Sequence, residues 1–279
     1  MRDIEEQTIL VTGATDGLGK RVASELLGKG ARVLLHGRSR ERLEDTLEEV
    51  RDQTGNEKLR YYLADFSSLG EVRGLANRML AEEERLDALV NNAGVIVPDR
   101  KESEDGYELT FAVNYLSHFL LTSLLLPLLR NSAPARIVNV ASAGQSPIDF
   151  ANVMLEHGYD VMRAYSQSKL AQIMFTFELS GRLSGTGVSV NALHPASLMN
   201  TKMVDEAFGY TISTVEEGAD ATVRLAASPE VEGVTGRYFD GKREASADRQ
   251  AYDEDARQKL WRMSEEMCTP FFDAVPRRR

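Results

Sequence analysis

A glycine-rich turn near the N-terminus limits what this chain can fold into more than any other feature. Residues 7–11 read as a short buried strand, residues 12–19 (TGATDGLG) follow at once, and a helical pattern comes next. This is the context that a phosphate-binding loop requires. In such a loop Gly13 permits the tight turn, Gly17 lets backbone N–H groups approach a pyrophosphate, and Gly19 allows close helix packing. The alternative is an ordinary βα turn with spare glycines, but the flanking strand and helix favour nucleotide binding.

The alternation of strand and helix patterns continues along the chain. Apolar runs that read as buried strands recur between amphipathic helical patterns, at residues 32–35, 59–63, 86–90, 135–140, 188–193 and 235–239. Such alternation predicts a parallel sheet with helices on both faces. We therefore expect an α/β fold, a Rossmann-type doubly wound parallel sheet of about seven strands, in a single domain over residues 1–279.

Composition narrows the possible functions. The chain has 279 residues, 42% of them hydrophobic, and can bury a sizeable core. Its formal net charge of -10 argues against nucleic-acid binding, because the phosphate backbone rewards clustered Lys and Arg. The basic run at residues 277–279 is expected to be a solvated end. One cysteine, Cys268, fits a reducing compartment, and the four scattered histidines suggest no metal site.

No targeting or membrane segment is visible in the sequence. Charges at Arg2, Asp3 and Glu5 precede the first strand, so a signal peptide is not expected. The most apolar run, residues 119–129, is far shorter than the ~20 residues that span a bilayer. We read it as a buried helix and expect a cytoplasmic protein without a membrane anchor.

The end of the second strand bears on the choice of cofactor. His36, Gly37 and Arg38 follow the apolar residues 32–35. An acidic side chain here would take the ribose hydroxyls of NAD, whereas an Arg accommodates the 2′-phosphate of NADP. Arg38 therefore favours NADP(H) over NAD(H), unless it merely ends the strand.

Tyr165 and Lys169 are the candidate residues for proton transfer. On a helix, residues four apart project from one face. A phenol with a reference pKa near ~10 is a reluctant proton shuttle, and a nearby ammonium draws its pKa downward. The spacing alone is weak, because a Tyr and a Lys four residues apart are common on amphipathic helices.

Several motifs together resemble the short-chain dehydrogenase/reductase family. The turn has the spacing G-x-x-x-G-x-G after Thr12, residues 91–94 read NNAG, Asn114 lies within a long apolar helix expected over residues 106–130, and Ser142 follows the fifth strand. The resemblance covers nearly the whole chain. It implies that Ser142, Tyr165 and Lys169 are catalytic and that Asn114 holds a relay water; a plain buried hydrogen bond is the other reading of Asn114.

The resemblance also implies a cofactor site. Asp65 and Phe66 would lie beside the adenine, although turn chemistry is the plainer reading, and Ser68 with Glu71 forms an expected capping box. Asn91 is expected to be more structural than catalytic. Ala196 replaces the usual Gly after Pro195, which puts a cofactor contact by Thr201 in doubt. The expected cofactor-binding residues are Gly13, Thr15, Asp16, Gly17, Leu18, Gly19, Arg38, Asp65, Phe66, Asn91, Ala93, Gly94, Tyr165, Lys169, Pro195, Ser197 and Leu198.

The spacing between Ser142 and Tyr165 is long for the family. This long spacing resembles the retinol-dehydrogenase-like branch of the family, and so do the C-terminal residues. We expect Ile148, Phe150, Val153 and Met154 to form an extra pocket wall. A substrate lid is expected at about residues 197–215. A C-terminal extension is expected at about 240–279.

The resulting prediction is an NADP(H)-dependent oxidoreductase that interconverts a carbonyl and an alcohol. One alternative is an alcohol dehydrogenase for a retinoid- or steroid-like substrate. Another is a catalytically silent NADP-binding sensor or partner module. The apolar helices around 106–130 and 162–184 carry more apolar surface than one sheet face needs, and in the family such helices pair across a two-fold axis. We therefore expect a homodimer or homotetramer. Neither the physiological substrate nor the preferred direction is readable from the residues.

Overall fold

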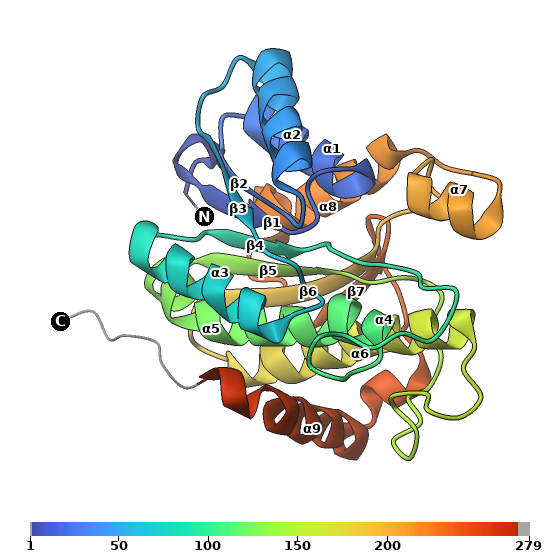
Figure 1. Ribbon diagram of the computed structural model, residues 1–279. Helices are drawn as coiled ribbons and strands as arrows, with labels where there is room; N and C mark the ends of the chain where they lie inside the picture. Colours follow the sequence, from blue (N-terminus) through green and yellow to red (C-terminus); the bar gives the residue numbers. More distant parts are fainter. Residues whose placement is uncertain (1, 273–279) are drawn as a thin grey trace.

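A computed structural model describes residues 2–272 and contains one eight-stranded sheet (Figure 1). The strand order is β3-β2-β1-β4-β5-β6-β7-β8, and every pair is parallel except β7 with β8. The strands are β1 Thr8–Val11, β2 Arg32–Gly37, β3 Leu59–Leu63, β4 Ala88–Asn91, β5 Ala135–Val140, β6 Val188–His194, β7 Arg237–Asp240 and β8 Arg243–Glu244. The doubly wound α/β fold is confirmed. The eighth strand was not predicted because it has two charged residues and no apolar pattern.

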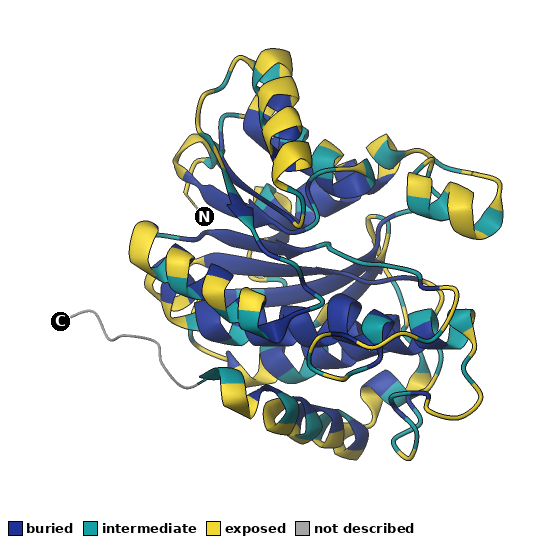
Figure 2. Cartoon of the chain, in the orientation of Figure 1, coloured by how far each residue is buried: buried dark blue, intermediate teal, exposed yellow. Residues whose placement is uncertain are grey.

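Helices cover both faces of the sheet. One face carries α1 Gly17–Gly28, α2 Arg40–Thr54 and α8 Val215–Ala227; the other carries α3 Leu69–Glu82, α5 Ser117–Asn131, α6 Val161–Arg182 and the outer α9 Glu254–Phe272 (Figure 1). The short helices are η1 Ile4–Glu6, α4 Leu109–Phe111, η2 Ala112–Leu116, α7 Lys202–Phe208, η3 Pro229–Val231 and η4 Arg249–Tyr252. Two buried apolar clusters form the core, one on each face of the sheet (Figure 2).

The long apolar helix is not continuous α-helix. Instead of one helix over residues 106–130, α4 gives way to the π-helical turn η2, and α5 follows. Together Leu109–Asn131 is long and apolar enough to cross a membrane, but 83% of its most apolar window is buried in the molecule. That is the burial of a core helix, which passes the same test of length and composition.

The C-terminal helix α9 covers the outer side of α5 and α6. The Trp261 ring lies 5.0 Å from Phe119 and 5.9 Å from Phe175, measured between centroids, with the Arg182 guanidinium 4.0 Å from the Trp261 ring. The apolar surface that suggested pairing with a second copy is therefore covered within one chain. The expected homodimer or homotetramer stays a prediction.

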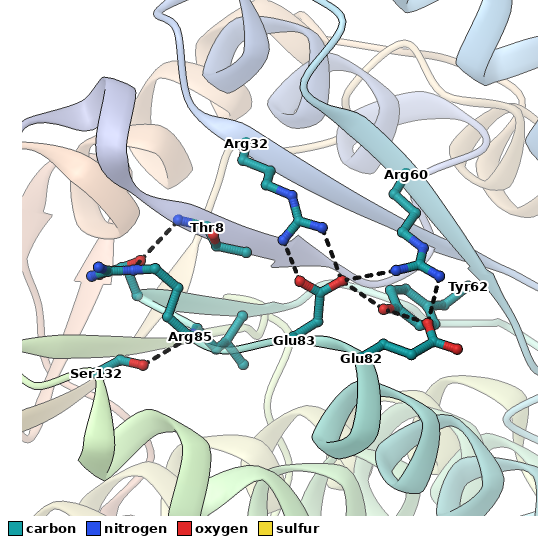
Figure 3. Close-up of polar contacts among 10 residues, drawn as sticks. Thr8, Arg32, Arg60, Tyr62, Glu82, Glu83, Arg85 and Ser132 are labelled. Atoms are coloured by element: carbon teal, nitrogen blue, oxygen red, sulfur yellow. Dashed lines mark hydrogen bonds and ion pairs between the residues drawn. The ribbon is translucent and has the colours of Figure 1, made fainter.

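A network of charges closes the amino-terminal edge of the sheet (Figure 3). Glu83 is 2% exposed, forms a bidentate pair with Arg32, and accepts a hydrogen bond from the Tyr62 hydroxyl at 2.6 Å. Arg60 completes the cluster by pairing with Glu82 at 2.6 Å. Because the buried carboxylate is paired and hydrogen-bonded, the network is structural, and it lies at the edge opposite the glycine turn.

The expected capping box of α3 is absent. Ser68 is the N-cap residue but makes no side-chain cap bond. Glu71 instead accepts from the backbone N–H of Asp65 at 2.7 Å, and Asp105 accepts from that of Leu69 at 2.8 Å. A carboxylate from a distant loop therefore caps this helix, which sequence spacing could not indicate.

Candidate active site

Ser142 and Tyr165 meet at the carboxyl edge of the sheet. Ser142 lies two residues past β5, Tyr165 lies in the second turn of α6, and the Ser142 side chain is near enough to the phenol to lower its pKa. The Ser142 hydroxyl also accepts from the Gly144 backbone N–H at 3.1 Å. The Ser142 carbonyl accepts from the Tyr238 hydroxyl of β7 at 3.0 Å. The serine is thus held from both sides.

Lys169 is buried one turn beyond Tyr165. It is 4% exposed, and its Nζ lies 5.6 Å from the centroid of the Tyr165 ring. The amine donates to the Val140 carbonyl and to Gln172 Oε1, both at 2.9 Å. Burial lowers the pKa of Lys169 to about 7.

The pKa of Tyr165 departs from the sequence-based expectation. Burial raises it, and the nearby Ser142 hydroxyl opposes the rise. The lowering that we expected from Lys169 is supplied here by Ser142. At neutral pH the phenol keeps its proton and can donate it.

Asn114 is a fully satisfied buried amide. Its oxygen accepts from the Val95 backbone N–H at 2.7 Å, and its nitrogen donates to the Val95 carbonyl at 3.1 Å and to Ser168 Oγ at 3.0 Å. A Cβ built on Gly94 would lie 3.3 Å from Asn114 Oδ1 and 3.7 Å from Lys169 Nζ. The lack of a side chain at position 94 thus lets Asn114 and the Lys169 amine lie close to the backbone.

The glycine turn has the backbone that a phosphate loop needs. Gly13 and Gly17 adopt φ values of +63° and +48°, in the left-handed region that side chains disfavour. A Cβ on Gly13 would come within 2.8 Å of Ala93 Cα, and one on Gly19 would collide with the Gly13 carbonyl. Helix α1 begins at Gly17, so its first N–H groups face the turn.

Thr12 and Asn92 hold the turn in place, and neither was among the expected site residues. Thr12 Oγ1 accepts from the backbone N–H groups of Asn92 and Ala93 at 2.8 and 2.9 Å. Asn92 Nδ2 donates to the carbonyls of Thr12 and Gly13 at 2.8 and 3.2 Å. Both residues stand inside motifs quoted from the sequence, but only the fold shows that the motifs bind each other.

Two buried histidines, His36 and His118, contact the glycine turn or the threonine that holds it. Neither was among the expected site residues. His36 Nδ1 accepts from the Gly13 backbone N–H at 3.3 Å, and its ring stacks on Phe66 at 4.1 Å. Burial lowers the pKa of His36 to about 4 and that of His118 to about 3, so both rings are neutral. A histidine inside an apolar run, as at 36, was the available signal. Phe66 is 4% exposed and lies under the turn, and Asp65 accepts from the Ser67 N–H at 2.9 Å.

Arg38 is an exposed cation at the end of β2. It has no hydrogen bond or ion pair within residues 2–272. Arg42, by contrast, donates to Asp16 Oδ2 at 2.8 Å and to the Thr15 carbonyl at 3.5 Å. Lys20 pairs with Glu49. Of these three cations, Arg38 is the one whose guanidinium is not engaged by another group of the described chain.

Asn91 proves to be an interior residue. Its side-chain nitrogen donates to Thr122 Oγ1 at 3.0 Å and to Asn139 Oδ1 at 2.8 Å, and the residue is 0% exposed. These contacts agree with the expectation that Asn91 is more structural than catalytic. They also leave its side chain unable to reach a bound cofactor.

The chain after β6 returns to the turn. His194 Nε2 lies 2.9 Å from Ser197 Oγ, and Leu198 has a φ of +44°, a strained value for a branched side chain. A Cβ built on Gly17 would lie 3.1 Å from Thr201 Cγ2, so Thr201 does lie over the turn despite Ala196. Pro195 borders the same region, against Gly218 of α8.

The structure bears on two expectations about the substrate side, the lid at about residues 197–215 and the pocket wall after Ser142. Helix α7, Lys202–Phe208, stands out from the body (Figure 1), and Tyr210 and Ile212 after it are 58% and 67% exposed. This is the geometry of a cover. Ile148 and Val153, however, are 3% and 6% exposed and belong to the core. These two residues do not form a pocket wall, because Gln250 of η4 binds the Ile148 backbone and Gln167 of α6 binds the Val153 carbonyl. Phe150 and Met154 are partly buried, and their place in a pocket wall stays a prediction.

The same edge of the sheet holds a phosphate-binding turn and a set of proton-transfer groups. This combination defines the class of dinucleotide-binding oxidoreductases. Within residues 2–272 no group of three or more His, Cys, Asp or Glu side chains could hold a metal.

The family itself is shown by comparison with known proteins. The family described as short chain dehydrogenase matches residues 7–209. Retinol dehydrogenase 14 of Homo sapiens is 42% identical over 291 residues, covering 94% of this chain and 86% of the relative. Retinol dehydrogenase 13 of Mus musculus is 41% identical over 275 residues, covering 92% and 82%. The chain belongs to the short-chain dehydrogenase/reductase family, in its retinol-dehydrogenase-like branch.

Solved structures agree with this assignment. An uncharacterized protein from Mycobacterium paratuberculosis has a TM-score of 0.78 and 28% identity, covering 95% of this chain and 94% of its own. The RhlG/NADP active-site complex of Pseudomonas aeruginosa has a TM-score of 0.70 and 30% identity, covering 86% and 97%. The chain is therefore an enzyme of the short-chain dehydrogenase type.

Proposed function

We propose that this protein is an NADP(H)-dependent oxidoreductase that interconverts a carbonyl and an alcohol, with Tyr165 as the general acid and base. The observation that carries the proposal is the convergence of Ser142, just past β5, and Tyr165 of α6 at one edge of the sheet, with the buried Lys169 amine 5.6 Å from the Tyr165 ring. A phenol, a hydroxyl and an amine in this order can move a proton to or from a substrate oxygen.

The residues around the turn fit a dinucleotide. The left-handed Gly13 and Gly17 would admit a pyrophosphate close to the backbone. The exposed guanidinium of Arg38 suits the additional 2′-phosphate of NADP. The similar Pseudomonas aeruginosa structure is an NADP complex, which supports this choice. When bound, the nicotinamide supplies or takes up the hydride.

The protein's own groups handle the proton and the charge. In reduction, the Tyr165 hydroxyl donates its proton to the substrate oxygen. Ser142 donates a hydrogen bond to the same oxygen, which fixes its position and stabilises the negative charge that develops. The charged form of Lys169 then favours the phenolate that remains. Asn114 keeps Val95 and the adjoining Gly94 in place. Oxidation is the reverse path.

A second candidate concerns the substrate. Relatives named retinol dehydrogenases are 41% and 42% identical over most of the chain. A long apolar alcohol or aldehyde of the retinoid kind is therefore a candidate, and the exposed Tyr210 and Ile212 offer apolar surface for it. A cytoplasmic location and assembly into dimers or tetramers stay predictions.

Turnover measurements test the proposal. The purified protein is assayed with a panel of aldehydes, ketones and alcohols, retinal and retinol included, in both directions with each phosphorylated and unphosphorylated cofactor. We expect turnover with NADPH, at a KM at least about tenfold below that for NADH, because a charge-assisted phosphate contact is worth about 1.5–3 kcal/mol. A rise in melting temperature with NADPH but no turnover on any substrate would instead favour the catalytically silent module.

A further inference from the structure

Gln172 is a buried polar side chain to which the reaction above gives no role. It lies on α6, three residues after Lys169, and is 1% exposed. Buried amides in folded proteins have hydrogen-bond partners. The partner of this amide is the Lys169 amine, since Gln172 Oε1 accepts from Lys169 Nζ at 2.9 Å.

The Lys169 amine sets the orientation of the Gln172 amide. An ammonium only donates, so the atom that faces Lys169 must be the amide oxygen. The amide nitrogen then lies 3.3 Å from Nδ1 of His118 on α5. That ring nitrogen donates to the Asn114 carbonyl at 2.9 Å, so it does not accept from the amide. The contact with Lys169 is therefore the one that fixes which way the amide points.

Two fixed acceptors define the position of the Lys169 amine. A lysine side chain is a flexible four-carbon stem with three donors. The Val140 carbonyl takes one donor at 2.9 Å, and Gln172 Oε1 takes another at 2.9 Å. With Val140 alone the amine could turn about a single bond, whereas two acceptors leave one N–H directed away from both.

The other groups that face this amine do not hold it. The titratable side chains near it are Tyr165 on α6, His118 on α5 and His194 on β6. Burial lowers the pKa of both histidines, so they are neutral near pH 7 and do not balance the positive charge. The neutral dipole of Gln172 can stabilise the ammonium without cancelling its field on Tyr165, which a carboxylate would do.

We propose that Gln172 is a positioning residue that holds the Lys169 amine, in its charged form, where it acts on the Tyr165 hydroxyl. The inference rests on the proposed function, because it gives Gln172 a part in the same proton transfer.

A pair of variants separates positioning from a merely structural role. Gln172→Met keeps the length of the side chain but removes the acceptor. Thr176→Val is the matched control: Thr176 lies one turn further along α6, is 0% exposed, and its hydroxyl bonds Asn139 and the Gln172 backbone carbonyl instead of the Lys169 amine. The readout is kcat/KM for alcohol oxidation with NADP⁺ from about pH 5 to about pH 10, whose rising limb reports the coupled Tyr165–Lys169 titration.

We expect Gln172→Met to move the rising limb upward by about one pH unit, which lowers kcat/KM about tenfold on its acid side. Thr176→Val should change the magnitude of kcat/KM without shifting the rising limb along the pH axis. An unmoved limb in Gln172→Met, or an equal shift in Thr176→Val, would overturn the inference. Absence of wild-type turnover would overturn the proposed function instead. If Gln172→Met does not fold, Gln172→Asn, whose shorter amide cannot reach Nζ, serves in its place with the same expected shift.

Discussion

At the scale of single residues, Arg38 decides the proposed cofactor preference. Its exposed guanidinium has no partner in the described part of the chain and stands at the end of β2. Arg38→Ala should raise the KM for NADPH about 10- to 100-fold and leave the KM for NADH within about threefold, since only the former carries the extra phosphate. Arg40→Ala is the control, because Arg40 already donates to Tyr61 at 2.9 Å. Equal effects on both cofactors would remove Arg38 from the site.

The two buried histidines predict how stability depends on pH. Burial lowers the pKa of His36 from 6.5 to about 4 and that of His118 to about 3. Below 6.5 the unfolded chain binds protons that the folded chain does not, so stability is full above that pH and is lost on acidification. Between pH 6.5 and about pH 5 each histidine should cost roughly 1.5 kcal/mol of unfolding free energy.

Urea unfolding at both pH values measures this loss. His118→Asn should remove the share assigned to its ring, roughly 1.5 kcal/mol, whereas His157→Asn, at an exposed position, should leave the acid-sensitive part unchanged. A wild-type stability that does not fall between the two pH values would contradict the neutral buried state of both rings.

At the scale of elements, the π turn η2 is a feature that the hydrophobic periodicity of the sequence did not predict. An apolar pattern with helical period predicted one helix over 106–130, and burial agrees with that pattern. A π turn inserts one residue per turn without changing which residues are apolar, so periodicity could not reveal it. It nevertheless sets the position of Asn114, whose oxygen reaches the Val95 N–H at 2.7 Å. The capping of α3 by Asp105 was hidden for a similar reason, since the contact is distant in sequence.

The packing of α9 gives a prediction at the same scale. Trp261 is 8% exposed and packs against Phe119 and Phe175. Trp261→Ala should lower the unfolding free energy by about 3–5 kcal/mol, as large-to-small changes in a core do. Tyr252→Ala, at a side chain that is 54% exposed, is the control and should change stability much less. A small effect at Trp261 in chemical denaturation would mean that α9 does not cover the core in solution.

At the scale of the whole molecule, the parallel sheet with helices on both faces and the shared edge of the site were predictable from alternating patterns and motifs. Gly13, Ser142, Tyr165 and Lys169 lie where their motifs indicated. Contacts between motifs were not predictable, because Thr12 bonding to Ala93 depends on strands β1 and β4 becoming neighbours. The inward folding of the segment after Ser142 likewise depends on Gln250 of η4, which lies far along the chain and binds the Ile148 backbone.

The proposed reaction depends above all on Tyr165 moving the proton beside a bound dinucleotide. Its most direct test compares wild type and Tyr165→Phe for NADPH affinity and for steady-state carbonyl reduction. We predict that the variant binds NADPH within about threefold of wild type and loses at least about 100-fold in kcat, since general acid catalysis contributes that much. A Tyr165→Phe variant that binds NADPH and turns over at the wild-type rate would contradict this role.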